Sequence, residues 1–401
     1  MSHNIKVKTP TNIFEINIFL EDQVIVKILH IINRLGPGGA EKLIEDLLPL
    51  MNNTDGVKVD LLLLTDKNNV FDKKLNKNGI QIKIVPTKKI YNPLNIYYIR
   101  KYIKKGQYDV VHVHLFPSFY WASFASKLIF KNKPKFVFTE HSTHNQRREK
   151  GYLRIIEKFV YSSYDKIISI SQQAEDNLIK WLKPKNNGRF IIIENGIDLK
   201  KFEEAKPYLK REINTKFDED TKLICMVGRF SEAKDQPTLI KAMKYIPSNV
   251  HLLLVGEGPL KEKNEQLVKQ INLEERIHFL GFRDDVPRIL KTVDIVVLSS
   301  HWEGLPLSAV EGMAAGKPLI GSNVPGIKEV VDNYGLLFSK GNSEELANKI
   351  NQLINDPLKY SEIAEKCQLR ANSYSIEKMV DEYIEQYKIL LNHKNREINE
   401  N

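Results

Sequence analysis

The sequence predicts an α/β protein with two Rossmann-like domains that face each other across a cleft. Short aliphatic and β-branched runs alternate with amphipathic segments along residues 24–200 and again along residues 221–375. This alternation is typical of parallel sheets with helices on both faces. Between the two series, residues 201–220 are charged and lack a strand pattern, so we interpret them as a connector. A chain of 401 residues is long enough for two separate cores.

The individual strands follow from the apolar runs. In the first series the candidate strands are 24–32, 59–64, 80–85, 109–115, 135–140, 166–171 and 189–194, with helical segments such as 40–51 and 117–128 between them. In the second series they are 223–228, 250–256, 276–281, 294–300, 317–322 and 334–339. Residues 1–23 precede the first core strand, and we expect a weakly ordered extension there. Residues 376–401 are predicted to form a helix that packs back towards the first domain.

The composition favours a globular protein of a reducing compartment. Hydrophobic residues make up 42% of the chain and charged residues 27%, which excludes fibrous and disordered classes. The chain has only two cysteines, and Cys225 lies in an apolar run that predicts a buried strand. No apolar run approaches the roughly 18 to 20 residues of a membrane span, and no signal peptide is recognisable. We therefore expect a cytoplasmic protein.

Positive charge is concentrated in the first half of the chain. Residues 1–200 hold 32 Lys and Arg against 19 Asp and Glu, whereas residues 201–401 hold 28 against 31. The segments 88–105 and 147–161 also mix basic residues with tyrosines, which suits a lipid headgroup layer. No recognised nucleic-acid-binding motif accompanies the charge, so we expect no nucleic acid partner. An anionic membrane surface and a merely solubilising surface both remain open.

The stretch 301–331 contains two glutamates, Glu303 and Glu311, on either side of a predicted helix start. The Gly-Leu-Pro sequence of residues 304–306 follows a strand and opens the helix, and proline is favoured in a first helical turn. Free N–H groups and the positive helix end favour an anion there. The two carboxylates could accept hydrogen bonds from sugar hydroxyls. The alternative is a helix cap and a solvated helix face.

Two further turns are predicted to approach a phosphorylated ligand. Arg229 ends one strand and Lys234 starts the next helix, so that together they could neutralise a diphosphate without metal. In the first domain, Gly38 and Gly39 follow the first strand and would let the backbone approach a ligand closely. This turn lacks the third glycine of G-x-G-x-x-G, which argues against a nicotinamide dinucleotide.

Taken together, these motifs resemble the retaining glycosyltransferases of family 4, the group 1 glycosyl transferases of the GT-B fold. The resemblance covers most of residues 24–390. The matching motifs are GPGGAEK, TEH at 139–141, ENGID at 194–198, VGRFSEAKDQ, LLLVGEGP, FLGFRDDV and the E-x7-E signature within EGLPLSAVEGMAAGKP. Each motif alone is weak, and their common order is specific.

The resemblance implies a role for each matching residue. In that family the basic pair holds the donor diphosphate, which corresponds to Arg229 and Lys234. The first signature glutamate binds the donor sugar and the second binds the ribose, which corresponds to Glu303 and Glu311, and a histidine matching His141 contacts the sugar. The donor-binding residues implied in this way are Gly38, Gly39, Arg229, Lys234, Phe282, Glu303, Gly304, Leu305, Pro306, Leu307 and Glu311. The residues implied in catalysis are His141, Glu303, Arg229 and Lys234.

The implied activity is retaining transfer of a hexose or N-acetylhexosamine from a nucleotide-diphosphate sugar to a glycan or lipid-linked saccharide, as in cell-surface polysaccharide biosynthesis. The first domain would bind the acceptor and the second the donor. Where many members have D-x-G-G, this chain has residues 323–326 (Asn-Val-Pro-Gly), so the donor sugar stays open. The alternative function is a non-catalytic nucleotide-sugar-binding protein or a sugar epimerase of the same fold.

We expect no metal or other cofactor. The one D-x-D sequence, residues 218–220, lies in the charged connector and is interpreted as a solvated turn. His112, His114, His141 and His144 are the alternative, because histidine is a common zinc ligand. Against that alternative, no cysteine accompanies them and His141 is already needed by the transferase site.

Overall fold

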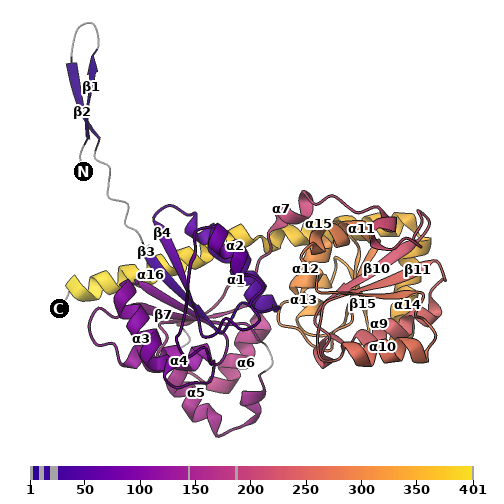
Figure 1. The fold of residues 1–401 in the computed structure, drawn as a ribbon, viewed down its shortest axis with the longest axis horizontal. Helices are drawn as coiled ribbons and strands as arrows, with labels where there is room; N and C mark the ends of the chain where they lie inside the picture. The colour runs from indigo at the N-terminus through magenta and orange to yellow at the C-terminus, as the bar shows by residue number, and fades with distance from the viewer. Residues whose placement is uncertain (1–2, 9–12, 19–25, 143–144, 186–187, 400–401) are drawn as a thin grey trace.

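The computed structural model describes residues 3–8, 13–18, 26–142, 145–185 and 188–399. It consists of two α/β domains, each with one parallel sheet, that lie side by side (Figure 1). The predicted two-domain α/β fold is therefore confirmed. None of the described helices is both long enough and apolar enough to cross a membrane.

The first domain contains a seven-stranded sheet in the order β5-β4-β3-β6-β7-β8-β9. Its strands are β3 (Val26–Ile32), β4 (Val57–Leu63), β5 (Gln81–Ile84), β6 (Val110–His114), β7 (Lys135–Glu140), β8 (Lys166–Ser169) and β9 (Phe190–Ile192). Its helices are α1 (Gly39–Asn52), α2 (Asp72–Lys77), α3 (Asn95–Gly106), α4 (Ser118–Lys127), α5 (Leu153–Tyr161) and α6 (Gln172–Leu182), with a 3-10 turn at Gln146–Glu149.

Both faces of this sheet are buried, which explains why its strands are almost continuously apolar. In β3, Ile28 and Ile32 pack in one cluster, whereas Leu29 and Ile31 pack in the cluster on the opposite face. The first cluster lies under α1, α2 and the C-terminal helix, and the second under α3 to α6 (Figure 1). His30 shares the parity of Ile28, so its side chain lies on the face towards α1.

The second domain contains a six-stranded sheet in the order β12-β11-β10-β13-β14-β15. Its strands are β10 (Lys222–Val227), β11 (Val250–Val255), β12 (Ile277–Gly281), β13 (Ile295–Leu298), β14 (Leu319–Ser322) and β15 (Leu336–Phe338). Its main helices are α9 (Gln236–Ala242), α10 (Lys261–Gln270), α11 (Val286–Thr292), α12 (Leu307–Ala314), α13 (Ile327–Val331), α14 (Ser343–Asn355) and α15 (Pro357–Ala371). Short 3-10 turns lie at Glu232–Lys234, Met243–Tyr245 and Asn372–Tyr374.

The chain passes between the domains at two adjacent places. Ile197 donates to Tyr374 O at 2.8 Å and accepts from Ile376 N at 2.9 Å. A Cβ on Gly196 would lie 2.5 Å from Ser375 O, so this turn needs glycine. After the first passage, the connector forms α7 (Leu199–Glu203) and α8 (Lys210–Ile213) and buries Phe217 in the second domain's core.

After the second passage, α16 (Ile376–Asn399) runs along the first domain (Figure 1). Its apolar side belongs to the same buried cluster as α1 and β3. The residues of α16 in that cluster are Ile376, Met379, Val380, Tyr383, Ile384, Tyr387 and Leu390. The last helix is therefore part of the first domain's core.

The N-terminal residues differ from the expectation of a weakly ordered extension. They contain two antiparallel strands, β1 (His3–Lys8) and β2 (Ile13–Ile18), with His3 paired to Ile18. Alternating apolar and polar residues in both segments favour a two-stranded ribbon. The ribbon stands apart from the first domain in Figure 1.

Candidate active site

The residues predicted to bind the donor lie at the carboxyl edges of the two sheets. In the second sheet the strand order reverses between β10 and β13, and Arg229 follows β10 while Glu303 follows β13. In the first sheet the order reverses between β3 and β6, and the turn with Gly38 follows β3. Open parallel sheets bind ligands at such reversal points. The topology thus brings the predicted residues to the expected places.

Lys234 and Glu303 form an ion pair at the reversal point of the second sheet. Lys234 Nζ lies 2.5 Å from Glu303 Oε1, and the same oxygen accepts a hydrogen bond from Ser300 Oγ at 2.6 Å. The two side chains are 19% and 12% exposed. Arg229 is exposed and forms no ion pair with any residue that the structure describes. A paired lysine beside an unpaired guanidinium is a site that can attract a polyanion.

The turn that carries Arg229 is held in shape by glycines of the neighbouring strand. A Cβ on Gly256 would lie 2.2 Å from Gly228 O, and a Cβ on Gly258 would lie 2.3 Å from Phe230 O. Gly256 also has φ +139, which side chains rarely adopt. The VGRF and VGEGP motifs therefore form one packed unit, and this packing gives a physical reason for their presence together.

The turn before α12 is packed in a similar way. Gly326, with φ +89, lies against the backbone of Glu303, where an added Cβ would be 2.6 Å from Glu303 O. Gly304 and Leu305 precede the helix, and Leu307 is its first residue. We expected Pro306 within the first helical turn, but it lies one residue before the helix. Pro306 is the N-cap, because its φ of −79° and ψ of 84° are not helical.

Glu311 lies on α12 where the two domains meet. Burial raises the pKa of its carboxyl to about 7, against the opposing effects of Lys42, Lys201 and Lys234. Lys42 and Lys201 belong to α1 and α7, so these cations come from both sides of the domain boundary. Lys201 Nζ also lies 2.5 Å from Asp46 Oδ1 of α1. The charges of lysines from both domains therefore act on Glu311.

The start of α1 contributes an open backbone. Gly38 is the N-cap and Gly39 the first helical residue, and a Cβ on Gly39 would meet no atom within 4 Å. A Cβ on Gly38 would instead lie 2.4 Å from the carboxylate of Glu41. Burial raises the pKa of Glu41, while the charges of Arg34 and Arg229 lower it. The field of Arg229 thus reaches the first domain.

Phe282, which follows β12, also meets the first domain. Its ring centroid lies 6.4 Å from that of Phe71, and the Phe282 side chain is 46% exposed. The partly exposed ring leaves a flat apolar surface at the sheet edge, on which a nucleobase could stack.

His141 directly follows β7 and is hydrogen-bonded to one other histidine of the first domain. Its Nε2 lies 3.0 Å from His114 Nδ1, and burial lowers the His141 pKa to about 4. The imidazole is therefore neutral at physiological pH. The structure brings Lys234 and Glu303 into direct contact, whereas none of the described contacts joins His141 to either of them.

The histidines invite a comparison with a metal site. His30, His112 and His114 place one ring nitrogen each within 4.8 Å of the others. Both nitrogens of His112 are engaged, by Tyr387 Oη at 2.5 Å and by Thr139 Oγ1 at 2.7 Å. Both nitrogens of His114 bond to other histidines. The ring nitrogens of His112 and His114 are thus all used in hydrogen bonds, which does not fit a preformed ligand set. His144 lies outside the described residues.

The D-x-D sequence lies in a turn before β10, on the edge opposite to Arg229. Asp218 Oδ1 accepts hydrogen bonds from Thr221 N at 2.8 Å and Thr221 Oγ1 at 2.6 Å. These bonds lower the pKa of Asp218. The aspartate thus stabilises a turn at the amino end of a strand.

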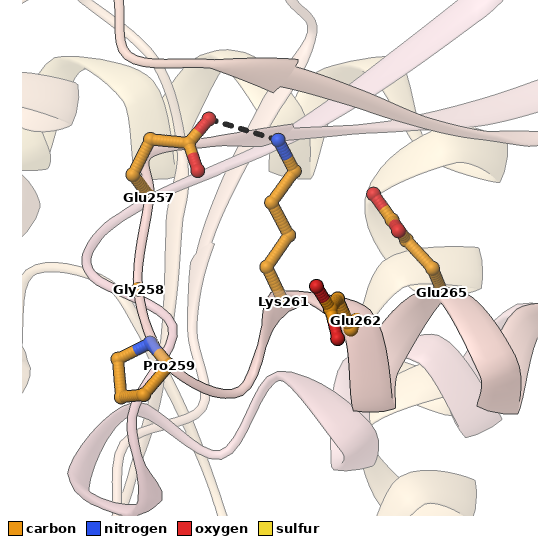
Figure 2. A pocket seen from close by; sticks show the side chains of 6 residues that line it. All are labelled: Glu257, Gly258, Pro259, Lys261, Glu262 and Glu265. Carbon is orange, nitrogen blue, oxygen red and sulfur yellow. Dashed lines mark hydrogen bonds and ion pairs between the residues drawn. The ribbon is translucent and has the colours of Figure 1, made fainter.

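Figure 2 shows a surface pocket at the end of β11, beside the VGEGP turn. Glu257 and Lys261 form an ion pair of 2.8 Å within it. Its lining residues are Glu257, Gly258, Pro259, Lys261, Glu262 and Glu265. Three glutamates against one lysine disfavour a diphosphate, and none of Arg229, Lys234 or Glu303 lines this pocket.

The sequence interpretation missed several residues that complete the site. Ser300 holds Glu303, the charge of Lys42 acts on Glu311, and His30 joins the row that ends at His141. Lys42 follows the predicted glycine turn by three residues, and this spacing could have indicated it. The sequence alone did not indicate His30. Its neighbour His112 becomes visible only in the register of β3 and β6.

Sequence comparisons agree with this arrangement over both domains. Residues 37–201 match the model of glycosyltransferase family 4, and residues 210–371 match that of the glycosyl transferases group 1. The chain is 28% identical over 304 residues to the UDP-Gal:alpha-D-GlcNAc-diphosphoundecaprenol alpha-1,3-galactosyltransferase of Escherichia coli, which covers 72% of this chain and 77% of that protein.

Two further relatives extend the comparison. The N-acetylgalactosamine-N,N'-diacetylbacillosaminyl-diphospho-undecaprenol 4-alpha-N-acetylgalactosaminyltransferase of Campylobacter jejuni is 25% identical over 354 residues, covering 85% of this chain and 93% of that protein. Among solved structures, Anabaena HepE in complex with UDP and glucose has a TM-score of 0.79 at 23% identity, over 90% of this chain and 99% of that chain. This second likeness is one of fold. From the two family matches, the ordered motifs and the shared architecture, the chain belongs to the group 1 glycosyltransferases of the GT-B fold.

Proposed function

We propose that this glycosyltransferase is a retaining enzyme that moves a hexose or N-acetylhexosamine from a nucleotide-diphosphate sugar to a glycan or lipid-linked saccharide in cell-surface polysaccharide biosynthesis. The observation that carries the proposal is the Lys234–Glu303 pair beside the exposed Arg229 at the reversal point of the second sheet. The names of the Escherichia coli and Campylobacter jejuni relatives, both transferases acting on diphospho-undecaprenol-linked sugars, support the acceptor class.

The reaction breaks the bond between the anomeric carbon and the β-phosphate oxygen of the donor. Negative charge grows on the leaving diphosphate, and Arg229 and Lys234 would stabilise it as it forms. When a phosphate takes over Lys234, Glu303 is released to accept hydrogen bonds from the sugar and to offset positive charge at the anomeric carbon. In this scheme the ion pair holds both groups in place until the donor arrives.

Retention follows if the acceptor hydroxyl attacks from the side of the leaving group. The new bond joins the acceptor oxygen to the anomeric carbon, and the hydroxyl proton passes to the departing phosphate. No protein base is needed, which agrees with the neutral, poorly basic imidazole of His141. His141 would contact the donor sugar, and the first domain would bind the acceptor.

The donor is proposed to be a UDP-sugar that binds without metal. Anabaena HepE was solved with UDP and glucose, and the name of the Escherichia coli relative specifies UDP-Gal. In this chain the two cations can take the charge that a metal would carry. Calorimetric titration with UDP, GDP and ADP, each with and without chelator, tests this. UDP binding that chelator leaves unchanged supports the proposal, and a strict metal requirement contradicts it.

Product analysis separates transfer from the alternative functions. Incubation with the UDP-sugar and a short-chain polyprenyl-diphosphate saccharide should give a new α-glycoside, whose anomeric configuration is read by NMR. A C2- or C4-epimerised sugar in place of a glycoside would identify an epimerase. Tight donor binding with neither product, across a panel of acceptors, would identify a binding protein.

We also propose that the enzyme works in the cytoplasm, docked on the inner face of an anionic membrane. The supporting feature is an apolar surface on α5 and the segment after α4, the α4–α5 patch, which a lysine contacts. Lys127 Nζ lies 3.9 Å from the centre of the Phe159 ring, which links the two segments. The exposed apolar residues of the patch are Leu128, Phe130, Tyr152, Ile155, Ile156 and Phe159. Exposed apolar side chains in a domain with excess positive charge are complementary to an anionic lipid surface.

Vesicle sedimentation tests the α4–α5 patch. Binding to phosphatidylglycerol vesicles should exceed binding to phosphatidylcholine vesicles and should fall with salt. Ile155→Ser with Phe159→Ser should weaken binding about tenfold or more, because each inserted side chain contributes on the order of 1 kcal/mol. Leu358→Ser with Leu369→Ser, two residues 86% and 70% exposed on the second domain, is the matched control. Equal loss in both pairs would contradict the proposal.

A further inference from the structure

An aromatic surface lies at the carboxyl edge of the first sheet, where β6 ends and α4 begins. The ring centroid of Phe116 lies 6.2 Å from that of Tyr91 and 5.1 Å from that of Tyr120. The guanidinium carbon of Arg147 lies 4.3 Å from the centre of the Phe116 ring. Phe116 is nevertheless 36% exposed, and Tyr91 is 65% exposed. These four residues form the aromatic platform.

The aromatic platform lies at the reversal point of the first sheet. The strands β3 and β6 are neighbours, but α1, which follows β3, packs on one face of the sheet and α4, which follows β6, packs on the other. Open parallel sheets bind ligands in the crevice between two such connections. The turn with Gly38 lies on the α1 side of this crevice, and Phe116 lies on the α4 side. The same sheet edge meets the second domain at the neighbouring rings of Phe71 and Phe282.

A buried carboxylate holds two members of the platform in place. Glu157 of α5 is 0% exposed, and its Oε1 accepts hydrogen bonds from Arg147 Nε at 2.8 Å and from Tyr120 Oη at 3.2 Å. Its Oε2 accepts a hydrogen bond from Trp181 Nε1 at 2.7 Å. Burying a carboxylate costs free energy that pairing and hydrogen bonds must offset. Because an apolar side chain would avoid this cost, the carboxylate indicates that Arg147 and Tyr120 need fixed positions.

The loops that carry the two exposed rings are also fixed. Asn33, which directly follows β3, donates from Nδ2 to Phe116 O at 2.7 Å. Leu115 has φ +62, a left-handed conformation that is strained for leucine and that is typical of functional loops. Asn95 is 0% exposed and donates to Ile90 O at 3.3 Å, directly before the exposed tyrosine. Rings that are fixed before a ligand arrives lose little entropy on binding.

The charge and chemistry of the platform favour a neutral sugar ring as its ligand. The charges of Arg147 and Glu157 cancel within one ion pair, so the platform offers little net charge to a phosphate. The C–H face of a pyranose is apolar and can stack on an aromatic ring, while its hydroxyl oxygens accept hydrogen bonds. A guanidinium has five N–H groups, and the bond from Arg147 Nε to Glu157 uses one of them. Arg147 can therefore donate to a hydroxyl of a sugar stacked on Phe116.

We infer that Phe116, Tyr91 and Arg147 bind a neutral pyranose of the acceptor, and that Glu157 is a positioning residue for this subsite. The statement that the pyranose belongs to the acceptor rests on the proposed function. The binding of a sugar ring does not, since it is a property of the free protein. The enzyme would then select its acceptor by the sugar, and a lipid-free glycoside should bind without the diphosphate.

Tyr245 provides a matched control in the second domain. It is 52% exposed, lies before β11 at the amino edge of the second sheet, and donates from Oη to Glu344 Oε1 at 3.2 Å. Tyr245→Ala removes an exposed ring and a hydrogen bond to a carboxylate without touching the platform. Phe116→Tyr is the conservative variant, because it keeps the ring that the sugar stacks on. The comparison of Phe116 with Tyr245 separates sugar binding from the general loss of an exposed ring.

The experiment is saturation-transfer difference NMR of the full chain with UDP and the methyl α-glycosides of glucose, galactose and N-acetylglucosamine, one at a time. The ring protons of at least one glycoside should receive saturation in the wild type, Phe116→Tyr and Tyr245→Ala. The signal should fall about fivefold or more in Phe116→Ala and in Glu157→Gln. It should be the same at low and high salt, because the ligand is neutral. No saturation in the wild type, or an undiminished signal in Phe116→Ala, would overturn the inference.

Kinetics with the UDP-sugar and a short-chain polyprenyl-diphosphate saccharide provide the second readout. Phe116→Ala should raise the acceptor KM about tenfold at nearly unchanged donor KM, and Phe116→Tyr should restore it. Glu157→Gln should raise the acceptor KM in the same way, whereas a merely structural role would lower stability and leave both KM values unchanged. An equal rise in donor KM, or the same rise in Tyr245→Ala, would overturn the acceptor subsite. If the wild type transfers no sugar while glycosides bind through Phe116, the proposed function fails and the sugar site stands.

Discussion

The two domains contribute chemically different side chains to the site. In the second domain, Arg229, Lys234 and Glu303 are acidic and basic side chains that are exposed or partly exposed and follow strands. In the first domain, His30, His114 and His141 are neutral, largely buried and placed by neighbouring strands. Charged groups suit the binding of a polyanion, whereas a buried neutral row suits the orientation of one polar group. The difference suggests that the second domain provides binding strength and the first provides alignment.

The largest effect is expected when the two cations of the second domain are removed. Arg229→Ala with Lys234→Ala should lower kcat/KM at least about a thousandfold, because each cation stabilises the leaving diphosphate. Initial rates with the UDP-sugar measure this, and circular dichroism checks the fold. Lys244→Ala, an exposed lysine of the same domain, is the control. Near-normal rates in the double variant would show that the diphosphate binds elsewhere.

Two glycine substitutions compare the turn after β11 with the turn at the start of α1. Gly258→Ala should weaken UDP binding about tenfold and cost about 1–3 kcal/mol of unfolding free energy, because its Cβ would lie 2.3 Å from Phe230 O. Gly39→Ala meets no protein atom, so the fold should keep its stability while donor KM rises if the diphosphate approaches this backbone. Calorimetry and thermal unfolding measure both. A stable, tightly binding Gly258→Ala would contradict the packing argument.

The pH dependence of stability tests whether burial raises the pKa of Glu311. Its pKa of about 7 is raised by burial, so the folded protein holds a proton that the unfolded chain has already lost above about pH 4.5. Stability from this group is present below that pH and is lost as the pH rises through 7. Between pH 5 and 8, wild type should lose up to about 3 kcal/mol relative to Glu311→Gln. Urea unfolding at each pH measures this, and parallel curves would refute the shift.

The smallest expected effect concerns α16 and the neutral side of the site. Tyr387→Phe removes the partner of His112 Nδ1 and should lower unfolding free energy by about 1–2 kcal/mol with kcat unchanged. Thermal unfolding and initial rates measure the two quantities. Leu391→Ala, a partly buried position on the same helix, controls for loss of packing alone. A fall in kcat would mean that the two histidine networks are coupled.

Much of the fold could be predicted because it depends on local patterns. Every predicted core strand has a counterpart, and KFVFTE coincides with β7. The places of Arg229 and Glu303 at strand ends could be predicted for a related reason, since each lies in a motif just after a strand. The N-terminal ribbon was missed although its alternating pattern was visible, because the segment was judged by its position before the core.

The histidine row could not be predicted in the same way. His30 and His114 are 84 residues apart, and only the sheet order β3-β6-β7 makes them neighbours. The pKa of Glu311 has a similar origin, because burial between elements distant in sequence raises it and the charges of Lys42 and Lys201, from two other helices, oppose that rise. Contacts between elements depend on register and domain placement, which a single sequence does not contain.

The position of α16 has a consequence for exchanging domains between such enzymes. The helix follows the second domain in sequence, yet its Tyr383 and Tyr387 complete the core of the first. A chimera joined once near residue 200 would set a foreign α16 against His112 and Thr139. Two junctions, near residues 199 and 375, would keep the helix with its own sheet. The second domain is thus inserted between two segments of the chain that together form the first domain.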